Sequence, residues 1–188
     1  MQISLRPVTA LALDAELAGS RAQLADALGV EIDEWPPEGG EWDRAAVEFF
    51  RQRVDDAATR RWGPAYVVAD DRLVGSAGFF GPPDEDGEVE IGYSVCRSER
   101  RRGIATAAVA ELCALAIAGG CASIRARTTA DNLGSIAVLE RNRFTESARA
   151  TGDDGVTTVE FRLAHGAGLI TGCDILAGSS TAPYRGLD

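Results

Sequence analysis

The residues with the clearest chemical potential in this sequence are three arginines at positions 100–102 and the glycine that follows them. They stand between an expected strand and an expected helix. The first turn of a helix presents unpaired backbone N–H groups at the positive end of its dipole. Gly103 and Ala105 would let an anion approach this backbone closely, and the guanidinium groups would add positive charge. Residues 98–106 therefore predict a diphosphate site. An exposed basic turn has the same residue types, so the pattern alone leaves both interpretations open.

A strand, a helix and a second strand must position this loop. Residues 88–96 predict the first strand. Residues 103–118 are Ala-rich and apolar nearly all round, which predicts a helix buried against a sheet. The second strand is expected at residues 121–128. Two strands joined through a helix in this way form a right-handed parallel crossover.

The remaining elements follow from hydrophobic periodicity and turn residues. We expect further strands at residues 3–8, 65–69, 73–80, 144–150 and 156–163, and helices at residues 11–28, 42–61 and 133–142, the first of them broken near Gly19. This order predicts an α/β (α+β) fold with helices on both faces of one sheet. The sheet is expected to be mixed, mostly antiparallel and twisted, with about seven strands.

The length of 188 residues suits one domain, which we place at residues 1–164. Residues 165–188 are rich in Gly, Ser, Thr and Ala without clear periodicity, and we expect them to form a flexible tail. An extra strand or a dimer contact within this tail is the alternative.

Composition excludes several classes of protein. The net charge of −10 argues against nucleic-acid binding, and no apolar run approaches the ~20 residues of a membrane span. There is no lysine for a Walker A or Schiff-base site, and His165 is the only histidine, so we expect no metal. Residues 1–7 do not resemble a secretory signal, so we expect a cytoplasmic protein with reduced cysteines.

Three motifs occur in one order from residue 88 to residue 144. They are Glu90-Ile91-Gly92-Tyr93 in the first strand, Arg100-Arg101-Arg102-Gly103-Ile104-Ala105-Thr106 in the loop, and Asn132-Leu133-Gly134-Ser135 leading to Val138-Leu139-Glu140 in the later helix. In this order and spacing the chain resembles the GNAT superfamily of N-acetyltransferases, and within it the branch of the ribosomal-protein N-terminal acetyltransferases. The resemblance is specific over residues 88–144, looser over residues 3–87, and does not extend to the tail.

The resemblance implies a site for acetyl-CoA, used as a co-substrate, in a central parallel strand-helix-strand unit. The loop would hold the pyrophosphate, and Val95 and Arg97 would pair their backbone with the pantetheine past a splay in the sheet. Asn132 would bond the pantetheine or acetyl region. The cofactor-binding residues implied are Val95, Cys96, Arg97, Arg100, Arg101, Arg102, Gly103, Ile104, Ala105, Thr106, Asn132 and Ser135.

Two residues are implied as catalytic. Ser135 would lie near the sulfur and could protonate the leaving thiolate, and Glu90 would deprotonate the amine, often through water. Each has a structural alternative. Ser135 and Asn132 could cap the helix, while Glu90 could order only the sheet or the acceptor site, because a neutral amine in the right position can suffice.

The sequence departs from the family pattern at four positions. Arg97 stands where Pro is common, Ala107 where Glu is common, and Leu139 where other branches have a tyrosine acid. Arg143 replaces the usual glycine before Phe144, at a position that favours positive φ. Gly103 and Ala105 follow the pattern, so cofactor binding depends on matched residues.

The function expected from these features is N-acetyl transfer from acetyl-CoA to a primary amine by direct attack. The acceptor would be a protein N-terminus or a small-molecule amine, and the chain a monomer or homodimer without nucleic-acid or membrane partners. The alternative is a catalytically weak or inactive acyl-CoA-binding module of the same fold.

Overall fold

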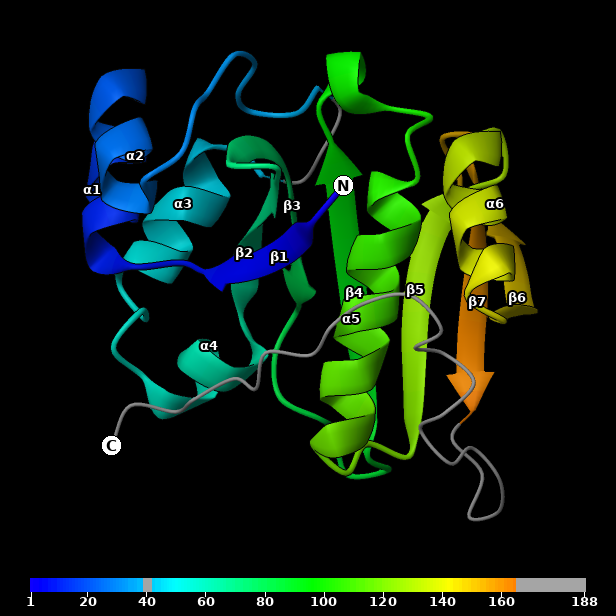
Figure 1. Cartoon of the computed structure of the whole chain (residues 1–188). Coiled ribbons are helices and arrows are strands. Elements are labelled where there is room, and N and C mark those ends of the chain that lie inside the picture. The colour runs from blue at the N-terminus through cyan, green and yellow to red at the C-terminus, as the bar shows by residue number, and fades with distance from the viewer. Residues whose placement is uncertain (39–41, 165–188) are drawn as a thin grey trace.

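The computed structural model describes residues 1–38 and 42–164, and these residues form one seven-stranded sheet with helices on both faces (Figure 1). The strand order is β1-β2-β3-β4-β5-β7-β6, and every neighbouring pair is antiparallel except β4 and β5. The strands are β1 (Ile3–Pro7), β2 (Pro64–Ala69), β3 (Arg72–Phe79), β4 (Glu88–Val95), β5 (Ser123–Thr129), β6 (Thr145–Thr151) and β7 (Thr157–Ala164). The predicted mixed, mostly antiparallel sheet is confirmed.

The helices of the described chain are α1 (Ala10–Leu17), α2 (Arg21–Leu28), α3 (Arg44–Arg51), α4 (Ala57–Trp62), α5 (Ile104–Ala118) and α6 (Leu133–Arg141), with a short 3₁₀ helix η1 (Arg97–Glu99). The expected break near Gly19 is confirmed, because Gly19 has φ 65° and Ser20 caps α2. The single helix expected at residues 42–61 is wrong. It is two helices, since α3 ends at Arg51, with Gln52 as its C-cap, and α4 begins only at Ala57.

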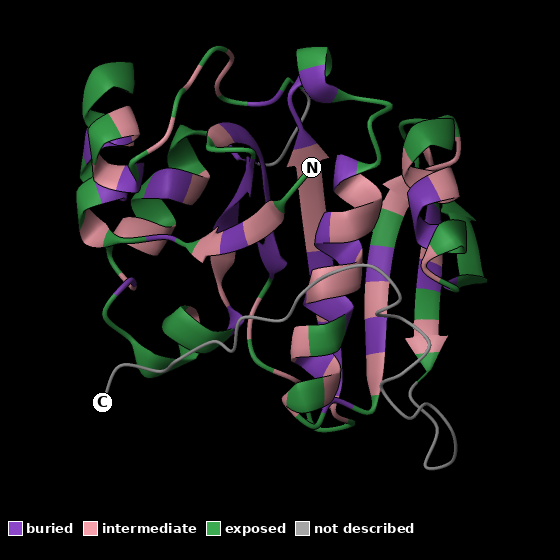
Figure 2. Cartoon of the chain, viewed as in Figure 1, coloured by how far each residue is buried: buried purple, intermediate pink, exposed green. Residues whose placement is uncertain are grey.

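Two hydrophobic cores lie on opposite faces of the sheet. Side chains alternate between the faces, so Val67 joins the core under α5 and α6 while its neighbour Tyr66 joins the core under α1, α2 and α3. Helix α5 contacts β1, β3 and β4 and supplies the largest set of buried helical residues (Figure 2). The helix therefore holds the middle of the sheet in place, as its apolar composition predicts.

The uncovered part of the second face is polar. Helices α1 to α3 pack over Tyr66 and Leu73 of β2 and β3, whereas β4, β5 and β7 carry charged side chains on that face. The sheet is thus apolar on both faces at one end and on only one face at the other. This asymmetry leaves one side of β4 accessible next to the α1–α3 layer.

The expectation of a flexible tail at residues 165–188 lies outside the described residues, as do His165 and Cys173. The other three cysteines, Cys96, Cys113 and Cys121, are free and buried, as expected. Burial raises the pKa of the Cys113 thiol to about 12, so it is inert at neutral pH.

The packing of α5 predicts a stability difference between two leucines. Leu112 is 1% exposed in the core under α5, whereas Leu133 at the start of α6 is 72% exposed. Leu112→Ala should lower the free energy of unfolding by about 2–5 kcal/mol, because it leaves a cavity, and Leu133→Ala by well under about 1 kcal/mol. Denaturant titration measures both. Equal losses of unfolding free energy in the two variants would show that the packing of α5 does not stabilise the core.

Candidate active site

The site is organised by a divergence of two strands. Pairing between β4 and β5 ends at Ile91 and Ala126, although β4 continues to Val95 and β5 to Thr129. Each strand keeps its other neighbour over this stretch, since β3 pairs with β4 up to Val95 and β7 pairs with β5 up to Thr129. The sheet therefore opens between residues 92–95 and 127–129, at the splay that the resemblance implied.

Backbone groups of β4 point into this opening. The amide of Phe80 donates to the carbonyl of Glu90 (3.0 Å) and that of Cys96 to the carbonyl of Val74 (2.9 Å), so even-numbered residues of β4 direct their backbone toward β3. Because the direction alternates along a strand, Tyr93 and Val95 direct theirs toward β5, where no strand pairs with them. An extended ligand could pair with these groups. The Val95 carbonyl already accepts a bond from Arg100 Nε (3.0 Å).

A second set of backbone donors lies directly beyond the strand. Helix α5 begins at Ile104, and its first backbone bond is from Ala107 N to Gly103 O (3.0 Å). Arg101 and Gly103 both have positive φ, 64° and 81°. Within the described chain, no acceptor is assigned to the N–H groups of residues 101–106. Alternating left- and right-handed residues of this kind form an anion-binding nest at a helix start.

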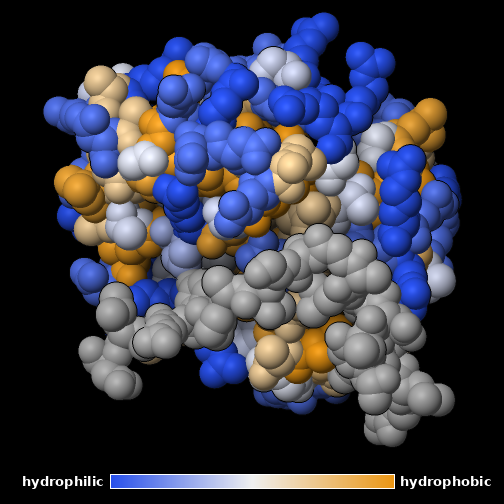
Figure 3. Space-filling view, in the orientation of Figure 1, coloured by the Kyte–Doolittle hydropathy of each residue, from blue (hydrophilic) through white to orange (hydrophobic). Residues whose placement is uncertain are grey.

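The three arginines of the loop differ in their partners. Arg100 donates to the carbonyls of Val95 and Glu38, and Arg102 is ion-paired with Glu99. Arg101 is exposed and has no assigned side-chain partner among the described residues. Figure 3 shows hydrophilic side chains gathered over this upper end of the molecule, where η1 and the start of α5 lie in Figure 1. Arg101 is thus the arginine best placed to meet an anion, while the other two brace the loop.

The loop is fastened to the N-terminal half of the chain by Glu34. Its carboxylate accepts the N–H groups of Arg97 (2.9 Å) and Ser98 (3.0 Å) and the Ser98 hydroxyl (2.7 Å). The Cys96 thiol donates to the Glu34 carbonyl (3.1 Å). The backbone N–H of Arg97, which the family resemblance assigned to the pantetheine, is therefore bonded to Glu34 instead. The side chain of Cys96 likewise contacts residue 34. Hydrogen bonds from Ser98, then from the Arg97 N–H, lower the pKa of Glu34.

Asn132 and Ser135 lie at the start of α6, as expected. Asn132 is the residue that caps α6, with its Oδ1 accepting the Ser135 N–H (3.1 Å), so the capping interpretation holds for it. The Ser135 hydroxyl is 2.8 Å from the Tyr93 hydroxyl, which reaches it from β4. The two motifs that flank the loop in the sequence therefore meet in the structure. Leu139, on the same helix, is fully buried and supplies no acid.

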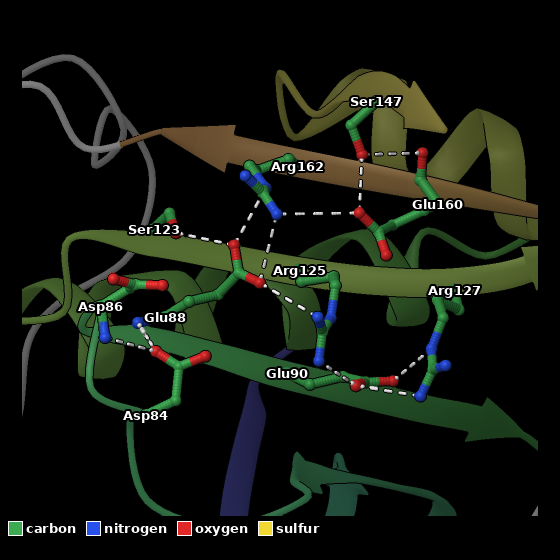
Figure 4. Close-up of polar contacts among 10 residues, drawn as sticks. All are labelled: Asp84, Asp86, Glu88, Glu90, Ser123, Arg125, Arg127, Ser147, Glu160 and Arg162. Atoms are coloured by element: carbon green, nitrogen blue, oxygen red, sulfur yellow. Dashed lines mark hydrogen bonds and ion pairs between the residues drawn. The ribbon is translucent and has the colours of Figure 1, made fainter. Parts of the chain in front are cut away.

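Glu90 lies in a network of ion pairs on the open face of the sheet (Figure 4). Its carboxylate receives Arg125 Nη2 (2.9 Å) and Arg127 Nε (2.9 Å), both from the adjacent strand β5. Glu88, on the same face as predicted, is bound by Arg125 and Arg162. Both oxygens of Glu90 are therefore occupied, and an amine would have to displace an arginine or work through water to use this carboxylate as a base.

Sequence reasoning missed Tyr93 and Glu34. Tyr93 was visible in the Glu90-Ile91-Gly92-Tyr93 motif, but only the structure shows that its hydroxyl reaches α6. Glu34 stands in a Pro-rich loop with no signal of its own, and its contacts span more than 60 residues of sequence. Contacts of such long range follow from the fold and not from local pattern.

One cavity of the described chain lies away from these residues. It measures about 240 Å³ between α1, α2 and α3, and Glu16, Trp35 and Trp42 line it. The Glu16 carboxylate is held by Trp35 Nε1 (2.8 Å), Trp42 Nε1 (2.9 Å) and the Tyr66 hydroxyl (2.6 Å). These bonds join α1, the loop between α2 and α3, and β2. None of the predicted site residues lines the cavity.

Within residues 1–38 and 42–164, no group of three or more His, Cys, Asp or Glu side chains is arranged to hold a metal ion. None of the described helices combines the length and the apolar character needed to cross a membrane.

With this geometry in hand, comparison with known proteins gives the family. Residues 2–145, which are most of the chain, match the acetyltransferase (GNAT) domain. The chain therefore belongs to the GNAT acetyltransferase family. An uncharacterized N-acetyltransferase, YjdG of Bacillus subtilis (strain 168), is 36% identical over 113 residues, which span 56% of this chain and 67% of that protein.

Solved structures share the fold at lower identity. RimJ of Mycobacterium smegmatis, in complex with CoA-disulfide, has a TM-score of 0.62 and 24% identity over 87% of this chain and 82% of its own. RimL, the ribosomal L7/L12 alpha-N-protein acetyltransferase in complex with coenzyme A, has a TM-score of 0.65 and 15% identity over 87% of this chain and 94% of its own. The predicted GNAT fold is confirmed.

The contacts of Glu34 predict an acid-dependent stability. A carboxylate whose pKa is lower in the folded than in the unfolded chain adds stability above its unfolded pKa, and this is lost as the pH falls through the folded pKa. Glu34→Gln should therefore flatten the loss of stability on the acid side of the ordinary glutamate range. Urea titrations from neutral pH downward measure this.

Glu85→Gln is the matched control. Glu85 is exposed on the loop before β4, and its side chain makes no assigned hydrogen bond or ion pair among the described residues. Its replacement should leave the acid limb unchanged. If Glu34→Gln and the unmodified protein lost stability in parallel as the pH falls, the hydrogen bonds of the Glu34 carboxylate to Arg97 and Ser98 would contribute nothing to the stability.

Proposed function

We propose that this protein transfers an acetyl group from acetyl-CoA to a primary amine by direct attack of the amine on the thioester. The observation that carries the proposal is the continuity of backbone groups without a strand partner, from Tyr93 and the Val95 N–H in the splay to the N–H nest at residues 101–106. The first set fits the amide groups of a pantetheine arm, and the second fits a diphosphate. No metal is required for this chemistry.

The loop and strand would hold acetyl-CoA along one line. The N–H groups of residues 101–106 would bind the diphosphate, with the Arg101 guanidinium beside it. Gly103 adds space as well as positive φ, because a Cβ built on it meets no protein atom within 4 Å. Val95 and Tyr93 would pair their backbone with the pantetheine, and Asn132 at the start of α6 would face it across the splay.

The amine would approach from the open face of the sheet. Ser94 lies on the same face as Glu88 and Glu90, opposite to α5, because side chains alternate along β4, and the Phe80 ring lies over Gly92 on that face. That face is bounded by the α1–α3 layer on one side and by the charged residues of β5 and β7 on the other. Access from this face supports an amine carried by a protein N-terminus or by a small molecule, and the residues do not favour one over the other.

Ser135 is the candidate donor to the leaving thiolate. Its hydroxyl lies beside the splay at the start of α6, and a positioned donor stabilises charge that develops on sulfur only as the C–S bond breaks. Glu90 has two assignments, a general base and an anchor for Arg125 and Arg127. Its ion pairs support the anchor, so that transfer would depend on a neutral amine held in position.

An acyl-CoA-binding module of the same fold, without turnover, is the second candidate. The ion pairs of Glu90 favour it, since they occupy the carboxylate that would activate the amine. Both candidates bind CoA, and only the enzyme acetylates an acceptor. A panel of amines, polyamines and N-terminal peptides with acetyl-CoA, followed by thiol release and mass spectrometry, separates them. Acetylated product from at least one amine is expected, and binding without any product would favour the module.

Gly103→Val should abolish CoA binding by calorimetry, because a β-branched side chain would occupy the phosphate position and is strained at φ 81°. Gly120→Val is the control, since Gly120 has φ 83° at the opposite end of α5 and its Cβ also meets no atom within 4 Å. Both variants should lose similar stability, but only Gly103→Val should lose CoA. Normal binding by a folded Gly103→Val protein would show that the nest is not the phosphate site.

Glu90→Gln distinguishes the two assignments of that residue. As an anchor, Glu90 should affect kcat/KM by less than about tenfold, with a pH–rate profile parallel to that of the unmodified enzyme and a lower Tm. Glu88→Gln, which also breaks pairs to arginine, should behave alike. A loss of about 10²-fold or more that shrinks at high pH, seen for Glu90→Gln alone, would identify Glu90 as the general base instead.

A further inference from the structure

The contact between Tyr93 and Ser135 bridges the splay on the α5 side of the sheet. Tyr93 is on the part of β4 that has lost its pairing with β5, and it packs against the core under α5. Its hydroxyl lies 2.8 Å from Ser135 Oγ and 3.2 Å from the Ser135 carbonyl oxygen. No other side chain of the described residues is assigned a hydrogen bond to the Ser135 hydroxyl.

Ser135 is held from two directions. Its N–H donates to Asn132 Oδ1 (3.1 Å), which fixes the backbone of the first turn of α6. Its hydroxyl meets Tyr93, which fixes the side chain. Because the helix start and the strand are otherwise separate elements across the opening, the tyrosine sets the position of Ser135 Oγ relative to the backbone of β4.

We propose that Tyr93 is a positioning residue for acetyl transfer: it donates its O–H to Ser135 Oγ and so leaves the serine proton directed at the departing sulfur. This inference rests on the proposed function. The Tyr93 side chain touches neither the thioester nor the amine in this arrangement, and it acts only through Ser135.

The 2.8 Å distance fits a hydrogen bond in either direction, and the proposal takes the one in which Tyr93 donates, because a phenol is a stronger acid than an aliphatic hydroxyl and so the better donor. Burial raises the pKa of Tyr93 to about 12, so its hydroxyl keeps its proton at neutral pH. A serine that accepts one hydrogen bond becomes a better donor of its own proton, because hydrogen bonds in a chain polarise one another. If the tyrosine instead donated only to the Ser135 carbonyl, the serine proton would point at the tyrosine oxygen and not at sulfur.

The step balances without a proton leaving Tyr93. The amine nitrogen forms the new C–N bond, and the C–S bond breaks with its electron pair on sulfur. Ser135 donates a hydrogen bond to the thiolate, and Tyr93 donates one to Ser135. The proton lost by nitrogen goes to solvent, and solvent protonates CoA after release.

Tyr93→Phe should lower kcat about tenfold, the scale of one hydrogen bond, while the Kd for CoA by calorimetry stays within about twofold. The double variant Tyr93→Phe with Ser135→Ala should be no slower than Ser135→Ala alone, because both changes break the same relay, the chain of hydrogen bonds from Tyr93 through Ser135 to the sulfur. Tyr66→Phe is the matched control, since the Tyr66 hydroxyl bonds Glu16 on the other face of the sheet. It should change Tm and leave kcat unchanged.

A second readout needs no acceptor. The pKa of the thiol of CoA bound to the protein can be followed by the ultraviolet absorbance of the thiolate. The relay should hold this pKa lower in the unmodified complex than in the complexes of Tyr93→Phe and Ser135→Ala, which should agree with each other.

The outcomes are distinct. An unmodified protein that acetylates no amine would defeat the proposed function, whereas the thiol titration would still test the relay. An unchanged kcat and thiol pKa in Tyr93→Phe would overturn the inference, and so would a loss of CoA affinity as large as the loss of kcat, which would assign Tyr93 to packing. If Tyr93→Phe did not fold, Ser135→Ala would test the same contact by the thiol pKa, and no shift there would also overturn it.

Discussion

The end of pairing between β4 and β5 is the constraint on which the rest of the site depends. Up to Ile91 the two strands form a parallel ladder, and beyond it each is held only by its antiparallel neighbour. A sheet does not leave strand edges open inside a domain without other contacts to hold them apart. Here α5 covers one face of the opening, and the bond between Tyr93 and Ser135 spans it. The backbone of Tyr93 and the N–H of Val95, which no strand pairs with, are what a second extended chain would require.

The loop beyond the splay is held in place by ion pairs. Arg102 and Arg72 both pair with the buried carboxylate of Glu99, and Arg72 also pairs with Asp33. Glu34 occupies the amides at the start of η1, so this helix end is not open to a ligand, whereas the amides at the start of α5 are. Two adjacent helix starts therefore have different roles. One is closed by the protein's own carboxylate, and the other is left for an anion.

The sequence predicted the fold well because its signals are local. The apolar helix at residues 104–118 follows from residue type and spacing, and the positive φ of 66° at Arg143 follows from its place where the family has glycine. The helix at residues 42–61 was predicted as continuous because its apolar residues keep a helical period, but the chain turns after Arg51 and restarts at Ala57. A turn without glycine or proline gives little local signal.

The site could be predicted only in part. The phosphate loop depends on one glycine and one helix start, which a motif records. The partners of Glu90 on β5 and the bond from Arg100 to the loop at residue 38 could not be predicted, because they depend on the packing of whole elements. Charged residues that look available in a motif can therefore be engaged in the fold, which is why the arginines and the glutamate have different roles from those that residue type alone suggests.

A crystal structure with acetyl-CoA tests the central claim most directly. The account predicts diphosphate oxygens within hydrogen-bond distance of the N–H groups of residues 101–106, the pantetheine paired with the backbone of Tyr93 and Val95, and the sulfur beside Ser135 Oγ. Acetyl-CoA bound elsewhere, for example in the cavity beside Trp35 and Trp42, or bound at the loop with its arm outside the splay, would contradict it.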